Sequence, residues 1–274
     1  MPDPLYIAAR RALLDALEAL GEHRAALIIV GAQAIYIHTG EGDLAVAPYT
    51  TDADVVIEPG VLREKTRIGD AMRQAGFERG TRVGSWLCLR RAGNMEVTVP
   101  VDLLVPEAVG GTGRRAARLG EHGKDVARKA RGLEPSLIDH DRRVLGAMED
   151  SDARTFEVRI AGPSALLIAE LHKLADRTDE PGKKRLKDKD ALDVLRLLRA
   201  TPMKVLVTGL GRLLGDSLCA EVTREAVEHL DRLFSTPAAP GSQMVVRATV
   251  RLEDPTAIAR SCATLATELL QALP

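Results

Sequence analysis

The segment 49–58, which reads Y-T-T-D-A-D-V-V-I-E, constrains the fold more than any other stretch of this chain. Asp52 and Asp54 stand two residues apart, directly before the apolar run 55–57. Residues two apart on a β-strand point to the same side, so the pattern predicts two carboxylates side by side at the start of a buried strand. Two such charges about 4 Å apart repel by roughly 1 kcal/mol in water and about 4 kcal/mol at an effective dielectric constant of 20.

Two interpretations of this D-x-D pattern are open. A divalent cation would remove the repulsion, and Mg²⁺ prefers oxygen ligands. Alternatively, the two aspartates belong to a turn, where they cap the strand or accept hydrogen bonds from their own backbone. The pattern alone does not distinguish the two, so the rest of the chain has to.

Composition places the chain among globular proteins. Its 274 residues are 45% hydrophobic and 28% charged, which suits one large domain or two ordinary ones. The net charge of −1 excludes a global basic field, so any surface that binds nucleic acid must be local. Aromatic residues make up only 3%, which argues against a platform for stacking single-stranded bases.

The cysteines and the N-terminal segment bear on location. Cys88, Cys219 and Cys262 lie far apart and form no C-x-x-C pair, which is typical of core residues in a reducing compartment. The start M-P-D-P-L-Y lacks the basic and apolar regions of a signal peptide, and no apolar run is long enough to span a membrane. We therefore expect a cytoplasmic protein with no membrane partner.

The first half of the chain alternates between helical and extended patterns. Helical spacing predicts helices over 5–20 and 62–75, each followed by a glycine. The apolar run 25–30 predicts a strand that runs into Gly31 and then directly into a helix. Further strands are predicted at the D-x-D run and over 86–90, 95–105 and 155–160.

The second half is mostly helical. Helices are predicted over 163–177, 186–199, 203–214, 220–234 and 255–273, whereas 236–250 reads as a loop followed by a possible strand, M-V-V-R-A-T-V-R-L. The predicted fold class is therefore α/β (α+β), a mixed sheet with flanking helices followed by a mostly helical C-terminal domain. The expected domains are 1–160 and 161–274.

Three features of the first half suggest phosphate chemistry. Gly31 begins a helix, where a glycine lets a phosphate approach the backbone N–H groups at the positive end of the helix dipole. Asp52 and Asp54 follow on one strand, and Asp102 lies inside the later apolar strand T-V-P-V-D-L-L-V. Three converging carboxylates can hold two divalent ions, which activate an attacking oxygen and neutralise a leaving group. This set predicts nucleotidyl transfer, which depends on positioning and electrostatic stabilisation.

The order V-G-A-Q-A-I-Y-I-H-T-G, T-T-D-A-D-V-V-I and V-P-V-D-L-L resembles the nucleotidyltransferase superfamily that includes DNA polymerase β. Within it, the chain is most similar to the AbiEii-type toxin nucleotidyltransferases, including the mycobacterial MenT toxins. Those proteins also carry a helical lysine and a K-D-x-x-D-L-like helix, which resemble A-E-L-H-K-L-A-D-R around Lys173 and K-D-K-D-A-L-D-V-L-R-L-L around Asp190 and Asp193. The resemblance covers roughly residues 25 to 200.

The resemblance implies an activity and partners. It implies transfer of a nucleoside monophosphate from an NTP to an acceptor hydroxyl, dependent on Mg²⁺ or Mn²⁺, in a cleft that the helical domain completes. For the toxin family it implies a tRNA 3′ end as acceptor and a cognate antitoxin protein. Two alternatives stay open: modification of a small molecule or a protein hydroxyl, and a non-catalytic module that binds a nucleotide or a partner.

Each candidate residue has a second interpretation. Asp52, Asp54 and Asp102 are the expected metal ligands, with Asp102 also the general base, but a carboxylate in an apolar strand also suits a buried ion pair. By resemblance Lys173 contacts the triphosphate; otherwise it is a solvated charge on a helix. By resemblance Asp190 belongs to the K-D-x-x-D-L-like helix of the site. Otherwise it forms ordinary ion pairs with residues three or four positions away on its own helix.

One departure from the family pattern concerns the phosphate site. The superfamily commonly has Gly-Ser or Gly-Gly where this chain has Gly31-Ala32. A serine hydroxyl there would help to hold the terminal phosphate, whereas Ala32 offers only its backbone N–H. Thr51, or Thr50, is a candidate to supply a hydroxyl instead.

Two basic segments are candidates for contacts with nucleic-acid phosphates, and each is equally consistent with an ordinary solvated surface. The first lies between Gly110 and Gly132 and contains Arg114, Arg115, Arg118, Lys124, Arg128, Lys129 and Arg131. The second consists of Lys183, Lys184, Arg185 and Lys187. His38 and His172 have no partners at metal-ligand spacing, and the chain contains no zinc motif.

Overall fold

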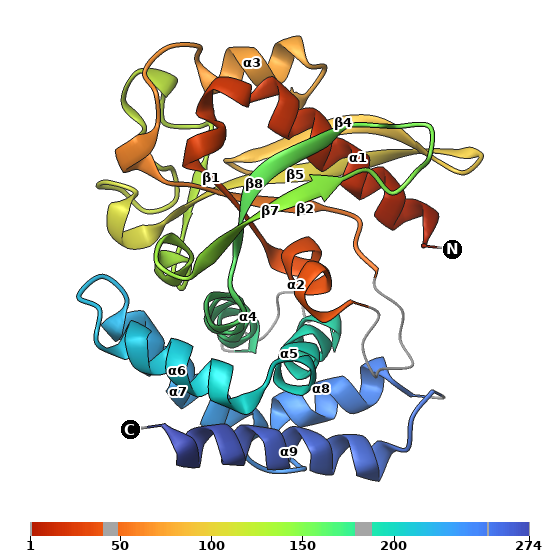
Figure 1. The fold of residues 1–274 in the computed structure, drawn as a ribbon, viewed down its shortest axis with the longest axis vertical. Coiled ribbons are helices and arrows are strands. Elements are labelled where there is room, and N and C mark those ends of the chain that lie inside the picture. Colours follow the sequence, from red (N-terminus) through yellow and green to blue (C-terminus); the bar gives the residue numbers. More distant parts are fainter. Residues whose placement is uncertain (1, 41–48, 179–187, 251, 274) are drawn as a thin grey trace. The chain divides into compact units, whose positions relative to one another are not determined.

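The computed structural model describes residues 2–40, 49–178, 188–250 and 252–273 (Figure 1). The described residues form a mixed parallel and antiparallel β-sheet with flanking helices, followed by a series of helices. This arrangement confirms the fold class predicted from the sequence. The chain divides into two compact units, Met1–Ala34 with Pro48–Ala161 and Ile35–Ala47 with Gly162–Pro274. The second basic segment, Lys183, Lys184, Arg185 and Lys187, lies outside the described residues.

Unit 1 is built on a sheet to which the described residues contribute eight strands. The strand order is β3-β4-β5-β2-β1-β8-β7, with β6 paired to β5 off this path. β2 pairs with β5, β1 with β8 and β5 with β6 in parallel, and the other pairs are antiparallel. The strands are β1 (Leu27–Val30), β2 (Ala53–Ile57), β3 (Glu78–Arg79), β4 (Ser85–Ala92), β5 (Met95–Pro106), β6 (Arg128–Ala130), β7 (His140–Gly146) and β8 (Thr155–Ala161).

Helix α1 (Pro4–Ala19) crosses one face of this sheet, over β4 and β5 (Figure 1). The Asp3 side chain caps its first turn by accepting a hydrogen bond from the Leu5 N–H at 2.8 Å. Leu13, Leu14 and Leu17 recur at helical spacing and are fully buried. Helix α2 (Gly31–Thr39) follows β1 without a loop, as the sequence predicted.

The connections of unit 1 contain the first differences from the prediction. The strand predicted over 25–30 begins only at Leu27, because the preceding residues form a 3₁₀ helix. The helix predicted over 62–75 is shortened to α3 (Ile68–Gln74), since Thr66 adopts a positive φ of 58°. The 3₁₀ helices are η1 (Gly21–Ala26), η2 (Pro59–Val61), η3 (Glu107–Val109), η4 (Gly120–His122) and η5 (Glu134–Leu137).

Two buried histidines account for the shortened helix. The His23 ring lies 2.7 Å from the Thr66 carbonyl oxygen, and the His122 ring lies 2.7 Å from the Arg63 carbonyl oxygen. His122 also accepts a hydrogen bond from the Ile68 N–H at 3.3 Å. These long-range contacts hold 63–66 in an irregular conformation, which overrides the local helical spacing.

Unit 2 consists mainly of helices. They are α4 (Pro163–Thr178), α5 (Asp188–Ala200), α6 (Met203–Leu214), α7 (Ala220–Phe234), α8 (Pro240–Ala248) and α9 (Pro255–Ala272). The helical predictions for this half are confirmed within the described residues. None of the helices formed by these residues is long and apolar enough to cross a membrane.

The possible strand M-V-V-R-A-T-V-R-L (244–252) was a wrong prediction, because 244–248 belong to α8. Pro240 stands in the first turn, where its missing N–H costs nothing. Met244 and Val245 are buried on one face of the helix. A Cβ at Gly241 would lie 2.7 Å from the Phe234 ring, so the helix packs tightly against the end of α7. Tertiary packing therefore outweighs the strand propensity of the two adjacent valines.

Candidate functional site

Asp54 and Asp102 are neighbours on the sheet of unit 1. They are register partners on the adjacent parallel strands β2 and β5, whose spacing is about 4.8 Å. Arg90 on β4 forms a hydrogen bond with Asp15 of α1, so even-numbered residues of β4 face this helix. Ser85 lies opposite Asp102 in the register and therefore faces away from α1. The two carboxylates share the sheet face that α1 leaves free.

Gly31 brings the start of α2 against Asp54. Its φ is +66°, and an added Cβ would lie 2.4 Å from Asp54 Oδ2. Both observations require glycine, the first because L-residues avoid positive φ and the second because a side chain has no room. The positive end of the α2 dipole favours the negative charge of this carboxylate.

Asp52 lies just before β2 and makes a local hydrogen bond. Its Oδ1 accepts from the Thr50 hydroxyl at 2.6 Å, a contact between two neighbouring side chains. Its backbone carbonyl accepts from Gln33 Nε2 at 3.2 Å, and Gln33 Oε1 accepts from Arg10 Nε at 2.8 Å. A buried chain of polar contacts therefore ties the start of β2 to α2 and α1. Burial lowers the pKa of Arg10, and the nearby Tyr6 hydroxyl acts in the opposite direction.

Asp102 is buried, with 5% of its surface exposed, and both of its cationic partners use one oxygen. Arg128 Nη2 donates to Oδ2 at 2.7 Å, and Arg82 Nη2 lies 3.5 Å from the same oxygen. Oδ1 is buried and has no hydrogen-bond partner among the described residues. The buried ion pair, which was the alternative interpretation of Asp102, is thus present. It engages Oδ2 and leaves Oδ1 without a hydrogen-bond partner among the described residues.

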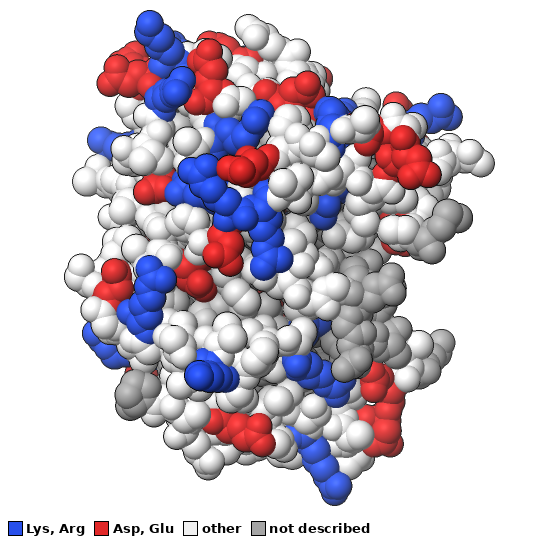
Figure 2. Space-filling model, in the orientation of Figure 1, with Lys and Arg blue, Asp and Glu red and all other residues white. Residues whose placement is uncertain are grey.

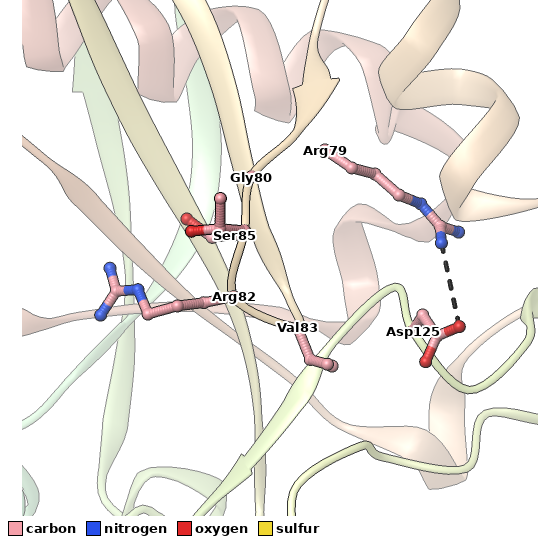
Figure 3. A pocket seen from close by; sticks show the side chains of 7 residues that line it. Arg79, Gly80, Arg82, Val83, Ser85 and Asp125 are labelled. Atoms are coloured by element: carbon pink, nitrogen blue, oxygen red, sulfur yellow. Dashed lines mark ion pairs between the residues drawn. The ribbon is translucent and has the colours of Figure 1, made fainter.

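A small pocket of about 120 Å³ lies beside the loop that carries Arg82 (Figure 3). The loop 80–84 carries Arg82, which both lines this pocket and reaches Asp102. In Figure 3 the Arg79 side chain points toward Asp125, 4.0 Å away, and Arg82 points in the opposite direction. The lining residues are Arg79, Gly80, Thr81, Arg82, Val83, Ser85 and Asp125.

Gly84 fixes the end of this loop to the sheet. Its carbonyl accepts from the Leu103 N–H at 2.7 Å. An added Cβ would lie 2.6 Å from both the Arg128 nitrogen and the Leu103 oxygen, and φ is +77°. The backbone that carries Arg82 is therefore held against the two strands that carry Asp102 and Arg128.

The carboxylates fit a divalent cation in part. Asp54 and Asp102 offer neighbouring oxygen ligands, and the unpartnered Oδ1 of Asp102 suits a hard cation. Asp52 has one oxygen engaged by Thr50. In the part of the chain that the structure describes, no three His, Cys, Asp or Glu side chains form a group that could hold a metal ion. Two of the three expected ligands are thus brought together as neighbours.

Lys173 and Asp190 belong to unit 2, where they join α4 to α5. Lys173 Nζ lies 3.0 Å from both Glu170 Oε2 and Asp190 Oδ1, and Arg177 pairs with Asp190 Oδ2. Asp193 continues the network by accepting from the Tyr36 hydroxyl at 3.3 Å, and its burial raises its pKa. These contacts are those of an ion network between helices, the alternative that the sequence left open for Asp190.

The remaining candidates have simpler surroundings. Ala32 and Thr50 are buried, and Thr51 is half-buried. The His172 ring lies 2.8 Å from the Val222 carbonyl oxygen in the core of unit 2. Cys88 is a core residue, as predicted, and burial raises its pKa to about 11.

The basic segment between Gly110 and Gly132 divides into engaged and exposed side chains. Arg128 pairs with Asp102, Lys129 donates to the Gly111 carbonyl at 2.9 Å, and Arg131 lies 3.6 Å from Glu107. The exposed ones are Arg114, Arg115, Arg118 and Lys124. Figure 2 shows several adjoining basic side chains in the upper half of the face in view, with acidic side chains beside them.

Sequence reasoning missed Gln33, Arg10 and Arg82, and it assigned Arg128 to a different role. Gln33 is a polar residue in the apolar start of α2, A-Q-A-I, and a buried amide there is a usable signal. Arg82 lies in R-G-T-R-V-G, where two glycines mark a tight loop with basic side chains. Comparison with protein-family models found no family that matches this chain, and comparison with curated proteins found no match.

Proposed function

We propose that the protein is a metal-dependent nucleotidyltransferase that moves a nucleoside monophosphate from an NTP to an acceptor hydroxyl and releases pyrophosphate. One observation carries the proposal: Asp54 and Asp102 are register partners beside the glycine that starts α2, and Asp102 keeps an unpartnered buried oxygen. A pair of carboxylates next to a helix N-terminus is suited to a polyphosphate and its counter-cation.

The order of elements supports membership of the nucleotidyltransferase superfamily, most like the AbiEii-type toxins. Strand β1 runs into Gly31 and α2. Strand β2, which is antiparallel to β1, carries Asp54, and β5, which is parallel to β2, carries Asp102. This is the order in which the sequence motifs that resemble that superfamily occur.

The proposed roles follow from the contacts in unit 1. Asp54 and Asp102 would hold Mg²⁺ or Mn²⁺, with Asp52 as a further ligand, and such an ion supplies charge neutralisation for the triphosphate. Asp102 Oδ1 is the proposed acceptor of the proton from the attacking hydroxyl. The backbone N–H groups at Gly31 and Ala32 and the hydroxyl of Thr51 are proposed phosphate contacts. Lys173 and Asp190 are left out, because their charges are engaged between α4 and α5.

Transfer of labelled nucleotide tests this proposal. We expect the protein to move label from an α-³²P-NTP to an acceptor in total tRNA, and Asp54→Asn and Asp102→Asn to lose about a hundredfold or more. Asp70→Asn is the matched control, because Asp70 is an exposed carboxylate of α3 that pairs with Arg73 in its own helix. Full transfer by Asp54→Asn would rule out the site.

The proposed acceptor is an RNA, with a tRNA 3′ end as the first candidate. The exposed cations Arg114, Arg115, Arg118 and Lys124 support this choice, since phosphate contacts supply most of the affinity for nucleic acid. Changing the three arginines to Gln is expected to weaken binding to tRNA. The slope of log Kd against the logarithm of the salt concentration is expected to fall by about 2–3. An unchanged salt slope would exclude this segment as the RNA contact.

A role as the toxin of a toxin–antitoxin pair is part of the proposal and rests on the family resemblance. Induced expression in a bacterial host is expected to stop growth, and Asp54→Asn is expected to abolish this effect. Coexpression of a small protein encoded beside the gene is expected to restore growth. Growth arrest by the Asp54→Asn variant would contradict a toxic activity at this site.

A non-catalytic nucleotide-binding module is the second candidate, and specific contacts favour it. Arg128 and Arg82 neutralise Asp102, and Thr50 engages Asp52. Among the described residues the three carboxylates form no group that could hold a metal ion. Binding of NTP by calorimetry without transfer to total tRNA, total protein or small hydroxyl acceptors would decide for this candidate. Transfer to a small molecule or a protein would instead correct only the acceptor.

A further inference from the structure

We propose that Arg82 and Arg128 are the triphosphate-binding residues of this site: they hold Asp102 in the free protein and exchange to substrate phosphates when Asp102 binds a cation. The inference rests on the proposed function, because it assigns substrate contacts within the same site. It is an exchange of ion pairs, with no covalent step.

The two arginines at Asp102 are arranged so that each can contact a second anion. Two guanidinium groups face one carboxylate oxygen, Arg128 at 2.7 Å and Arg82 at 3.5 Å. The contact with Asp102 uses Nη2 of each group, and a guanidinium group carries five N–H donors in all, so each arginine has donors for a further anion. Guanidinium groups bind phosphate oxygens in a bidentate manner, which makes a phosphate the fitting second anion.

Exposure allows that anion to reach the guanidinium groups. The Arg82 side chain is 52% exposed and that of Arg128 is 28% exposed, whereas that of Asp102 is only 7% exposed. The two arginines thus connect the buried carboxylate to solvent. A polyanion can contact them without first entering the buried position of Asp102.

The loop that carries Arg82 permits its side chain to change partners. The Gly84 carbonyl accepts a hydrogen bond from the Leu103 N–H, which fixes the end of the loop. The long side chain of Arg82 can still rotate about its own bonds. The pocket of about 120 Å³ beside the loop offers the hydroxyl-bearing residues Thr81 and Ser85 as further hydrogen-bond partners. Arg79 points to Asp125 instead and does not compete for the same position (Figure 3).

Cation and phosphate must then bind cooperatively. A divalent cation at Asp102 is repelled by the two guanidinium groups as long as they remain on Oδ2. A triphosphate removes this repulsion by taking the guanidinium groups as its own partners. Each ligand therefore raises the affinity for the other, and the coupling is reciprocal.

Titrations of the whole chain with Mn²⁺ and with inorganic triphosphate, separately and together, test this exchange. Arg82→Gln is expected to bind Mn²⁺ alone about threefold or more tightly, because a competing cation is gone. The same variant is expected to bind triphosphate in the presence of Mn²⁺ about tenfold more weakly, because a charge-assisted contact is lost. Arg128→Gln should shift both affinities in the same directions.

Trp86 provides an optical readout beside calorimetry. It is the only tryptophan of the chain, it follows Ser85 of the pocket, and its indole N–H donates to the Val126 carbonyl at 3.0 Å. The control is Arg142→Gln, since Arg142 is an exposed arginine of the same sheet that pairs with Glu157. This control is expected to bind both ligands like the unchanged protein.

The opposite signs of the two effects separate the exchange from a structural role. If Arg82→Gln weakens Mn²⁺ and triphosphate binding together, or changes neither, the inference is wrong while the nucleotidyltransferase proposal stands. If the unchanged protein binds no triphosphate with Mn²⁺ present, the proposed function fails as well. Should Arg82→Gln not fold, Arg82→Lys keeps the charge, and it must still weaken triphosphate binding because the bidentate contact is lost.

Discussion

Asp102 in unit 1 and Asp190 in unit 2 are buried to nearly the same extent, with 5% and 3% of their surface exposed. Each lies between two basic side chains, but the pairs are arranged differently. Lys173 forms an ion pair with Oδ1 of Asp190 and Arg177 with Oδ2, so each oxygen has its own cation, although Oδ2 makes no hydrogen bond of regular geometry among the described residues. Both guanidinium groups near Asp102 use Oδ2, and Oδ1 has no hydrogen-bond partner among the described residues.

The difference separates a structural carboxylate from one that can still bind a ligand. When both oxygens of a buried carboxylate are paired, its charge is compensated and its removal leaves cations without partners. A carboxylate with one free oxygen keeps the capacity to accept a proton or to bind a cation. Burial alone does not distinguish the two aspartates, whereas the distribution of their cationic partners over the two oxygens does.

The largest expected effect is on folding. Asp190→Ala should lower the free energy of unfolding by about 3–5 kcal/mol, because Lys173 and Arg177 lose their shared partner between α4 and α5. Urea denaturation at pH 7 measures the loss. Asp188→Ala is the matched control in the same helix, where the partly exposed pair with Arg247 is expected to contribute about 1 kcal/mol or less. Equal losses in the two variants would remove the structural side of the comparison.

Asp102→Asn should show the converse behaviour. An amide can still accept a hydrogen bond from Arg128, so the free energy of unfolding is expected to change by about 1 kcal/mol or less. Transfer activity is expected to fall about a hundredfold, which corresponds to about 2.7 kcal/mol in the activation barrier. Kinetics of label transfer and urea denaturation on the same preparation measure both. A variant that is unstable and fully active would reverse the assignment of the two aspartates.

Gly31→Ala tests how closely the Asp54 carboxylate approaches the start of α2. The positive φ alone is expected to cost about 1 kcal/mol, and displacement of the Asp54 carboxylate should raise the loss to about 2 kcal/mol or more. Gly93→Ala isolates the first contribution, because Gly93 has φ of +60° and no atom within 4 Å of an added Cβ. If the two variants lose equal stability in thermal unfolding, the close approach of Asp54 to Gly31 is wrong.

The smallest effect concerns Asp152, an ion-paired carboxylate outside both sites. Hydrogen bonds from the Arg154 side chain lower the pKa of Asp152 from 3.8 to about 2. Because the folded-state pKa lies below the ordinary value, the pair stabilises the fold above about pH 4, and this contribution is lost as pH falls toward 2. Because solvent screens this pair, its contribution to the free energy of unfolding is about 1 kcal/mol. Asp152→Asn should therefore be less stable at pH 7 and approach the unchanged protein in urea titrations toward pH 3. A difference that stays constant with pH would contradict the assignment.

Local signals in the sequence were enough for much of the fold. Helices α6 and α7 begin and end at the residues predicted from apolar spacing, since that spacing is visible within one or two turns. The strand after Asp52 and the strand around Asp102 were also predicted from their apolar runs. Their pairing in register was not predicted, because apolar runs indicate where strands lie but not which strands pair.

Long-range contacts account for what the sequence did not reveal. Arg82 and Arg128 reach Asp102 from 20 and 26 residues away, and nothing in the local pattern indicates that they share one carboxylate oxygen. Residues 62–67 have helical spacing, yet His23 and His122 hold part of this segment in an irregular conformation. In each case a polar contact from a distant segment decides the outcome, and periodicity carries no information about such contacts.

The division of helix α2 between the two units has a consequence for folding during synthesis. Every strand of the described sheet has been made once Ala161 emerges, whereas Ile35 and Tyr36 belong to the unit completed by Gly162–Pro274. Tyr36 meets its partners Lys189 and Asp193 only after α5 has been made. The first turn of α2, beside the carboxylates, can therefore form early, while its later turns wait for the end of the chain. A nascent chain that stops after the sheet would expose an aromatic and an aliphatic side chain that the complete protein buries.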